Sequence, residues 1–350
     1  MSPRERVVTA LACRQPDQVP INLAFTPSLY EVFRRETGAT DPAEYFDLET
    51  RRLGIRPTRC RTDFTPWLGE LPEGSSVSEW GVGEVRGSLF HFTDYVHPLT
   101  KACTPHEVHD YPWPDILADY RWDDFADRVR KTQGRGYAVS AGMEEFFETA
   151  WALRGLENML CDMAQDPDMA TALLDGVGHI FLEYNRRVAE AGVDVMRLGD
   201  DVGTQRGMMI SVEMFRRWLK PWYARAAETA RMIKPDIHIF YHSDGDIRPI
   251  LDDLVEAGIN VLEPVQPECM APEWVKQEYG DHLALWGTVG TQTTMPFGSP
   301  DEVRRVVRER IETVGRGGGL LLAPTHVLEP DVPWDNVVAF AQAARAYGKY

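Results

Sequence analysis

From residue 137 to the C-terminus the chain alternates short apolar stretches with amphipathic ones, and this alternation constrains the fold more than any other feature. Apolar runs typical of buried strands lie at residues 137–142, 193–199, 237–241, 260–265, 282–287 and 319–323. Segments with helical periodicity separate or follow them, at residues 145–186, 211–233, 246–257, 272–279, 300–314 and 335–346. Strands that alternate with helices in this way indicate parallel βαβ units.

Two further strands are expected near residues 20 and 56, which makes eight strand positions. Eight such units in a chain of 350 residues favour an α/β fold of the TIM-like (β/α)8 barrel type over a doubly wound sheet. No GxGxxG follows any expected strand, which removes the main signal for a dinucleotide-binding domain. Residues 41–130 are irregular, with a hairpin-like stretch at 76–92, and we interpret them as a partly β insertion or lid on a single domain spanning residues 1–350.

Charge and cysteine usage exclude several classes of protein. The formal charge of −17, from 54 acidic and 37 basic residues, would repel a phosphate backbone, so nucleic acid is not expected as a partner. The five cysteines are scattered and lack CxxC spacing, which indicates reduced thiols instead of a disulfide framework. No run approaches the roughly 20 apolar residues that span a bilayer. We therefore expect a soluble, cytoplasmic protein that does not bind membranes.

The residues that follow the expected strands are polar, and in a TIM barrel the catalytic groups lie at the C-terminal ends of the strands. We take the following as candidates for catalysis, substrate binding or metal binding: Glu144, Glu145, Asp200, Asp201, Gln205, Tyr241, His242, Asp244, Glu263, Gln266, Gln292 and His326.

Three of these residues form a candidate metal site. His242 and Asp244 are two apart, so in extended chain their side chains face the same side. His326 ends the last strand and could supply a third ligand across the mouth of the barrel, in a set that suits zinc or another borderline divalent metal. The alternative is that Asp244 or Asp246 caps the next helix and that His242 is a hydrogen-bonded core residue. For Asp246 the cap is the better interpretation.

The remaining acidic candidates also have two interpretations. Asp200 and Asp201 are adjacent, so one of them can face the barrel axis and take part in acid–base chemistry or orient a substrate, while the other caps a turn. Glu144 and Glu145 either contact substrate or place negative charge at a helix N-terminus. The glutamines could hydrogen-bond a polar ligand, although a lone glutamine in a loop is a weak signal.

Taken together, several phrases of the sequence resemble the uroporphyrinogen decarboxylase superfamily, and within it the branch of corrinoid-dependent methyltransferases. The matching stretches are residues 6–20, 199–205, 211–221, 241–267, 296–303 and 318–336. The resemblance implies a single TIM-like barrel, commonly a homodimer, with its site in a cleft at the strand ends.

The sequence departs from both branches of that superfamily. True decarboxylases need no cofactor, and they hold the carboxylates of their substrate with arginines of an N-terminal segment that here reads Leu-Ala-Phe-Thr-Pro-Ser at residues 23–28. The methyltransferases bind zinc through His-x-Cys and a later Cys. His242 matches that histidine, Asp244 replaces the first cysteine, and His326 lies in the region of the second. Oxygen and nitrogen ligands suit a harder site that polarises an oxygen, as in methyl transfer from an ether or alcohol.

The resemblance leaves three functions open. The first is a methyltransferase that moves a methyl group between a small substrate and a cobalamin carried by a partner corrinoid protein, with zinc held by His242, Asp244 and His326. The second is a cofactor-free carboxy-lyase in which the same acids move protons. The third is a binding protein that kept the barrel and lost the zinc thiolates.

Overall fold

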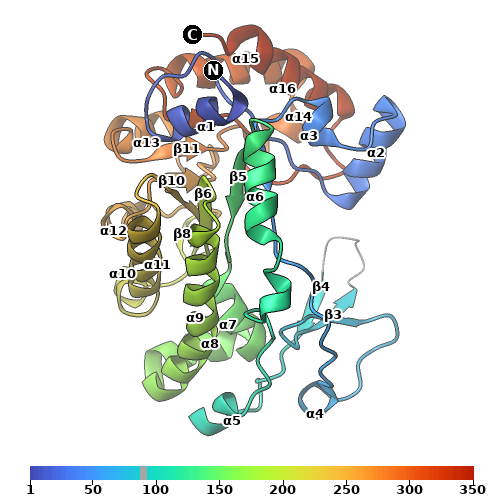
Figure 1. The fold of residues 1–350 in the computed structure, drawn as a ribbon, viewed down its shortest axis with the longest axis vertical. Helices are drawn as coiled ribbons and strands as arrows, with labels where there is room; N and C mark the ends of the chain where they lie inside the picture. Colours follow the sequence, from blue (N-terminus) through green and yellow to red (C-terminus); the bar gives the residue numbers. More distant parts are fainter. Residues whose placement is uncertain (87–92) are drawn as a thin grey trace.

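The computed structural model describes residues 1–86 and 93–350, and its centre is a curved parallel sheet of seven strands (Figure 1). The strands lie side by side in chain order: β1 (Thr50–Arg52), β5 (Ala138–Ala141), β6 (Val195–Gly199), β9 (His238–His242), β10 (Val261–Glu263), β11 (Ala284–Trp286) and β12 (Leu320–Leu321). Parallel strands in sequential order, each followed by helix, are the arrangement of a TIM barrel, so the expected fold class is confirmed.

The segment at residues 20–23 takes the eighth strand position. Leu322 N–H donates to the Pro20 carbonyl at 2.9 Å, and Asn22 N–H donates to the Leu322 carbonyl at 3.0 Å, which makes a short parallel bridge to the end of β12. The strand expected near residue 56 lies instead at β1. Gly54 and Pro57 explain the displacement, because neither residue favours a continued ladder.

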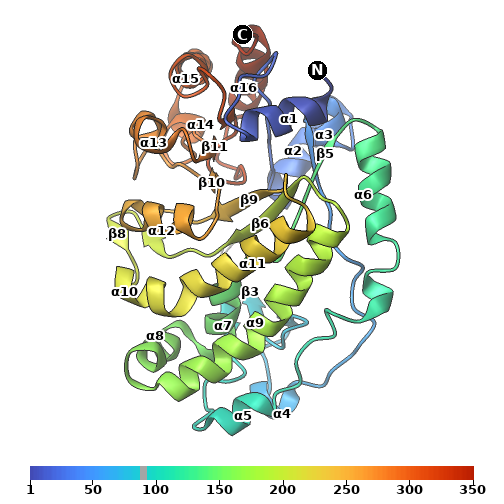
Figure 2. The same cartoon turned by 60° about the vertical axis from the view of Figure 1, so that its left-hand side comes forward.

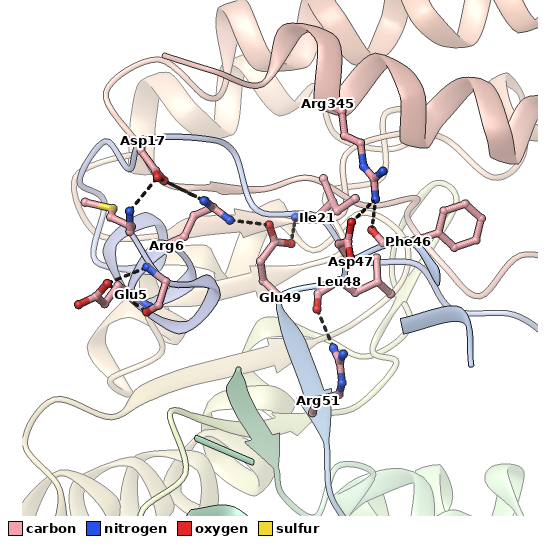
Figure 3. A network of polar contacts seen from close by, with 12 residues as sticks. Glu5, Arg6, Asp17, Ile21, Phe46, Asp47, Leu48, Glu49, Arg51 and Arg345 are labelled. Atoms are coloured by element: carbon pink, nitrogen blue, oxygen red, sulfur yellow. Dashed lines mark hydrogen bonds and ion pairs between the residues drawn. The ribbon is translucent and has the colours of Figure 1, made fainter. Parts of the chain in front are cut away.

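Side chains join this eighth segment to β1 and close the sheet (Figure 3). The buried carboxylate of Glu49 accepts hydrogen bonds from Ile21 N–H at 3.0 Å and from Arg6 Nη1 at 3.2 Å. Burial raises the pKa of Glu49 against the opposing effects of these two donors. Asn22 Nδ2 also donates to Thr50 Oγ1 at 2.8 Å. The seam of the barrel is therefore polar, with its buried groups paired.

Helices surround the sheet, and their bounds follow the amphipathic segments of the sequence. The longest, α9, packs against α7, α8 and α11 along one side of the molecule (Figure 2). The helices are α1 (Pro3–Leu11), α2 (Pro27–Thr37), α3 (Pro42–Tyr45), α4 (Thr65–Leu68), α5 (Pro105–His109), α6 (Phe125–Gly134), α7 (Phe146–Arg154), α8 (Leu156–Gln165), α9 (Pro167–Glu190), α10 (Val212–Met214), α11 (Lys220–Ile233), α12 (Leu251–Glu256), α13 (Pro272–Tyr279), α14 (Thr294–Phe297), α15 (Pro300–Thr313) and α16 (Trp334–Tyr347). Single 3-10 or π turns lie at Asp119–Arg121, Phe215–Leu219 and Arg248–Ile250.

Within the predicted insertion the structure has a small antiparallel sheet of β2 (Ser76–Val77), β3 (Gly83–Arg86) and β4 (Thr93–Val96). It lies with α4 and α5 away from the chain termini (Figure 1). The hairpin expected at residues 76–92 is present as far as residue 86, and its remainder lies outside the described residues. A lid function for this region and the single-domain organisation stay predictions. None of the helices in the described part of the chain is both long and apolar enough to cross a membrane.

The interior of the barrel is filled by inward-facing side chains and is closed at its N-terminal end by α1. This cluster consists of Val7, Leu11, Ala138, Val195, Phe240, Val261, Ala284, Trp286, Leu321 and Ala323. The first turn of α1 is held by a capping box between Ser2 and Glu5, with Pro3 at the first helical position. The plugged end leaves the opposite end, where the strands finish, as the place for a cavity.

His238 makes the closed end of the barrel sensitive to acid. The residue is 5% exposed, and its Nδ1 accepts a hydrogen bond from Asn260 Nδ2 at 3.1 Å. Burial, aided by the charge of Lys234 and opposed by those of Asp194 and Asp236, lowers the pKa of His238 from 6.5 to about 4. The unfolded chain therefore takes up a proton below pH 6.5 that the folded protein does not, so stability falls as pH decreases from 6.5 towards 4.

We expect the wild-type protein to lose about 2 kcal/mol more of its free energy of unfolding between pH 7 and pH 5 than the His238→Gln variant loses. Urea unfolding of both proteins at the two pH values measures this difference. Equal losses in the two proteins would show that His238 does not carry the acid sensitivity.

Candidate active site

The register of the sheet directs two predicted site residues into the open end of the barrel. His242 on β9 pairs with Glu263 on β10, and two residues earlier on the same strands Phe240 pairs with Val261 in the barrel interior. Because strand side chains alternate between the two faces, His242 and Glu263 also face inward, one layer above the apolar core. They line a cavity of about 720 Å³.

His242 is held by a carboxylate on each side of its ring. Its Nδ1 lies 2.5 Å from Glu263 Oε2, and its Nε2 lies 3.6 Å from Asp201 Oδ1. Burial lowers the pKa of His242, but the charge and hydrogen bond of Glu263, together with the charges of Asp244 and Asp201, outweigh it and raise this pKa to about 10. With Glu263 occupying Nδ1, the Nε2 atom is the one turned towards the other carboxylates.

Asp201 and Asp244 complete a compact group of possible metal ligands around that nitrogen. Asp244 N–H donates to Asp201 Oδ1 at 2.7 Å. One nitrogen of His242 and one oxygen from each aspartate lie within 4.8 Å of one another. Burial and the charge of Asp201 raise the pKa of Asp244. A half-buried imidazole flanked by two carboxylates is a donor set that a divalent cation can satisfy.

Gly203 and Gly245 allow the loops after β6 and β9 to approach each other closely, which brings Asp201 and Asp244 together. Gly245 has φ of 84°, and a Cβ atom there would lie 2.7 Å from the carbonyl carbon of Gly203. Asp246 N–H donates to the Thr204 carbonyl at 2.9 Å across the same junction. The Asp246 side chain accepts hydrogen bonds from Arg248 N–H and from the Arg248 guanidinium, one residue before the N-cap residue Ile247 of the turn Arg248–Ile250, so it is not the N-cap that the sequence predicted.

His326 does not belong to the compact group of ligands. It is exposed and lies where the main cavity meets a second pocket of about 220 Å³, which Asp244, Gln266 and Gln292 also line. Of the three residues predicted as metal ligands, the structure thus brings His242 and Asp244 together, and it places Asp201 where a third ligand was expected from His326.

Asp200 lies beneath the cavity floor, while its neighbour Asp201 lines the cavity. Asp200 is 0% exposed and accepts hydrogen bonds from Glu148 N–H at 2.7 Å and from the Tyr223 hydroxyl. It therefore caps the first turn of α7. Burial raises the pKa of Asp200 to about 7, despite these hydrogen bonds. A catalytic role for Asp200 does not fit this placement.

Tyr241 and Gln205 also lie away from the cavity. Tyr241 alternates with His242 along β9, so its ring is buried on the outer face of the sheet, edge-on to Tyr223 with 5.1 Å between centroids. Gln205 is exposed in the turn between β7 (Gly203–Thr204) and β8 (Gly207–Met208), where Cys269 Sγ donates to it at 3.2 Å. Substrate binding by either residue does not fit the structure. Gln266 is buried and accepts a hydrogen bond from Gly245 N–H at 3.2 Å.

Glu144 is bound by two arginines that sequence reasoning missed. Arg197 Nε and Nη2 donate to its two carboxylate oxygens at 2.8 and 3.3 Å, and Arg52 Nη2 lies 2.7 Å from Oε1. Burial would raise the pKa of Glu144, but these guanidiniums outweigh it and lower the pKa. A usable signal was present, because an arginine inside the apolar strand 195–199 requires a buried partner.

Glu145 and Glu148 place two further carboxyl groups on the cavity wall. Glu145 is the N-cap residue of α7, with φ of 64°, Glu148 lies in the first turn of that helix, and both line the cavity. Burial, together with the charges of Asp200 and Asp201, raises the pKa of Glu148 to about 8. Glu148 is therefore mostly protonated at neutral pH, a property that the sequence pattern does not reveal.

Comparisons with known proteins agree with the fold and indicate the family. A family model described as uroporphyrinogen decarboxylase (URO-D) matches residues 92–347. A methylated-thiol–coenzyme M methyltransferase from Methanosarcina mazei is 24% identical over 67% of this chain and 62% of the relative. A methylcobamide:CoM methyltransferase from Methanosarcina barkeri is 24% identical over 63% of this chain and 61% of the relative. A uroporphyrinogen decarboxylase from Pelodictyon phaeoclathratiforme is 23% identical over 50% of this chain and 48% of the relative.

Among solved structures, a methyltransferase from Methanosarcina mazei superposes with a TM-score of 0.72 at 20% identity and covers 99% of both chains, so the two share a fold. The two curated methyltransferases are matched over about three-fifths of their own length. The family model matches residues 92–347, which is well over half of the chain. On that evidence the chain belongs to the uroporphyrinogen decarboxylase family.

Proposed function

We propose that this chain is a methyltransferase whose cavity holds a divalent metal through His242, Asp201 and Asp244, and that it moves a methyl group between the oxygen of a small substrate and a corrinoid carried by a partner protein. The observation that carries the proposal is the group of one imidazole nitrogen and two carboxylate oxygens within 4.8 Å, at the end of the barrel where this fold keeps its catalytic groups.

The donor atoms fit a borderline or hard divalent ion such as zinc. Glu263 takes the Nδ1 position of His242, which is the usual arrangement behind a histidine ligand and leaves Nε2 free for the metal. Three protein ligands leave a position open for substrate. No cysteine belongs to the group of ligands among the described residues, so the site lacks the thiolates of the related zinc motif.

A metal bound there would polarise the oxygen of a methyl ether or alcohol. When the bond between oxygen and methyl breaks, its electron pair stays on the oxygen, which must then take a proton. Glu148 lines the cavity with a pKa near 8, so at neutral pH it can supply that proton. Glu263 holds the His242 ring in one orientation throughout.

The names of the relatives support the choice of reaction. Two curated relatives are methyltransferases, and one of them acts on methylcobamide by its printed name. That similarity supports a corrinoid partner protein for this chain, and the family resemblance supports a homodimer. Both are part of the proposal.

Methyl transfer to free cob(I)alamin from a panel of methyl ethers and alcohols tests the proposal. We expect turnover by zinc-loaded protein that falls at least about 100-fold in His242→Ala, since a metal ligand is lost. The exposed histidine variant His282→Ala is the matched control and should retain wild-type turnover. Release of CO₂ from a carboxylate without metal would instead identify a lyase, and the absence of any turnover would leave a binding protein.

A further inference from the structure

The cavity has a second polar wall, on strands β1, β5 and β6 that lead up to β9 with His242, formed by Arg52, Ser140 and Arg197. Arg52 on β1 and Ser140 on β5 are direct partners in the sheet, and Arg197 lies on the adjacent strand β6. All three side chains line the cavity. Their inward direction follows from strand alternation, because Ala138 and Val195, two residues before Ser140 and Arg197, belong to the barrel interior.

The two arginines share the carboxylate of Glu144, and the charge of Arg52 also reaches Glu145. Glu144 accepts from Arg197 at 2.8 and 3.3 Å and pairs with Arg52 at 2.7 Å. The Arg197 guanidinium also lies 3.8 Å over the ring of Phe240, so its position is set by packing as well as charge. Among the described residues no partner bonds Arg197 Nη1 or the remaining nitrogens of Arg52, and the Arg52 side chain is 63% exposed.

Ser140 adds a hydroxyl group to the same wall. The residue is 3% exposed and lines the cavity. Its oxygen is not one of the buried unpaired polar atoms among the described residues, so it is open to the cavity and to a bound molecule. A hydroxyl donor beside two incompletely bonded guanidiniums is the arrangement that binds a planar oxyanion.

We propose that Arg52, Arg197 and Ser140 form a carboxylate-binding subsite, so that the methyl donor is a small carboxylic acid carrying a methoxy group. This assignment of substrate class rests on the proposed methyl transfer. The carboxyl group of Glu145 on the same cavity disfavours a dianion such as phosphate, so a monoanion is the better match.

The spacing of the barrel layers suits a compact acid. Arg197 is the sheet partner of Phe240, and His242 lies two residues further along β9, where successive inward-facing residues are about 7 Å apart. A molecule with one or two carbons between its carboxylate and its ether oxygen spans that separation. The carboxylate would therefore rest on the arginines while the ether oxygen faces His242, Asp201 and Asp244.

Binding of methoxyacetate and of its neutral analogue 2-methoxyethanol to metal-free protein tests the subsite without requiring turnover. Isothermal titration should give methoxyacetate at least about tenfold higher affinity than 2-methoxyethanol, as expected for a charge-assisted hydrogen bond. Arg52→Gln should remove most of that preference, and Ser140→Ala should weaken methoxyacetate binding about threefold or more. Arg304→Gln, at an exposed arginine paired with Asp301, is the matched control and should bind as the wild type does.

Equal affinity for the two probes, or unchanged methoxyacetate binding in Arg52→Gln, would overturn the subsite. Arg197 is 12% exposed and stacked on Phe240, so the conservative change Arg197→Lys is the second variant. The lysine keeps the positive charge but loses the paired N–H donors of the guanidinium, and this variant should bind methoxyacetate at least about threefold more weakly than the wild type. If methoxyacetate binds as expected and zinc-loaded protein transfers no methyl group, the proposed function fails while the carboxylate subsite stands.

Discussion

Asp201→Asn is expected to bind Zn²⁺ about 100-fold more weakly than the wild-type protein, whereas His326→Ala should bind it within about threefold of wild type. Asp201 offers a carboxylate oxygen within 4.8 Å of the ligand atoms of His242 and Asp244, and His326 is not a member of that group. The asparagine keeps an oxygen that can accept the hydrogen bond from Asp244 N–H, so the loop should retain its shape. Competition titration with a chromogenic chelator measures both affinities.

The pair of variants also distinguishes two possible ligand sets. Strand spacing alone suggested His242, Asp244 and His326, because His326 ends the strand that closes the barrel. A 100-fold loss in His326→Ala with normal binding in Asp201→Asn would restore that set and contradict the one described above. Circular dichroism and a thermal melt of each variant without metal would show that the comparison is made between folded proteins.

Gly199→Ala is expected to lower both stability and metal affinity. A Cβ atom at Gly199 would lie 2.5 Å from the His242 carbonyl oxygen and 2.6 Å from the His242 Cβ, closer than real Cβ contacts come. The neighbouring strands β6 and β9 must therefore shift apart in the packed centre of the sheet. Overpacking of this kind costs about 3 kcal/mol, and displacement of a metal ligand costs about 10-fold to 100-fold in affinity.

Gly134→Ala is the matched control for Gly199→Ala. A Cβ atom at Gly134 meets nothing within 4 Å, and the residue ends helix α6. Urea midpoints and Zn²⁺ titration of both variants provide the measurements. Equal midpoints for the two variants would show that the sheet absorbs the added methyl group at Gly199 without moving His242.

The barrel could be predicted from the sequence because its strands and helices carry local patterns. The expected strands near residues 138, 194, 238, 261, 283 and 320 all correspond to strands of the central sheet. The strand near residue 20 is reduced to a bridge, and β1 lies earlier than expected. Both belong to the seam of the barrel, where Glu49 and Arg6 replace part of the backbone ladder. Such side-chain closure leaves no periodic signal.

The site could be located from the sequence, but the direction of its side chains could not be read fully. Strand alternation puts His242 in the cavity and Tyr241 outside it, yet the turn after β6 decides that Asp201 faces the cavity while Asp200 caps α7. Arg52 and Arg197 were missed because their partner, Glu144, is distant in sequence from both. Pairings of this kind depend on the closed sheet.

Anomalous diffraction at the zinc edge, from crystals of the wild-type protein grown with Zn²⁺, tests the central claim most directly. The expected result is one strong peak at the end of the barrel, about 2.0–2.2 Å from His242 Nε2 and from one carboxylate oxygen each of Asp201 and Asp244, with Glu263 on the opposite nitrogen of the ring. The absence of a peak there, or a peak bound by His326 without Asp201, would contradict the account of this site.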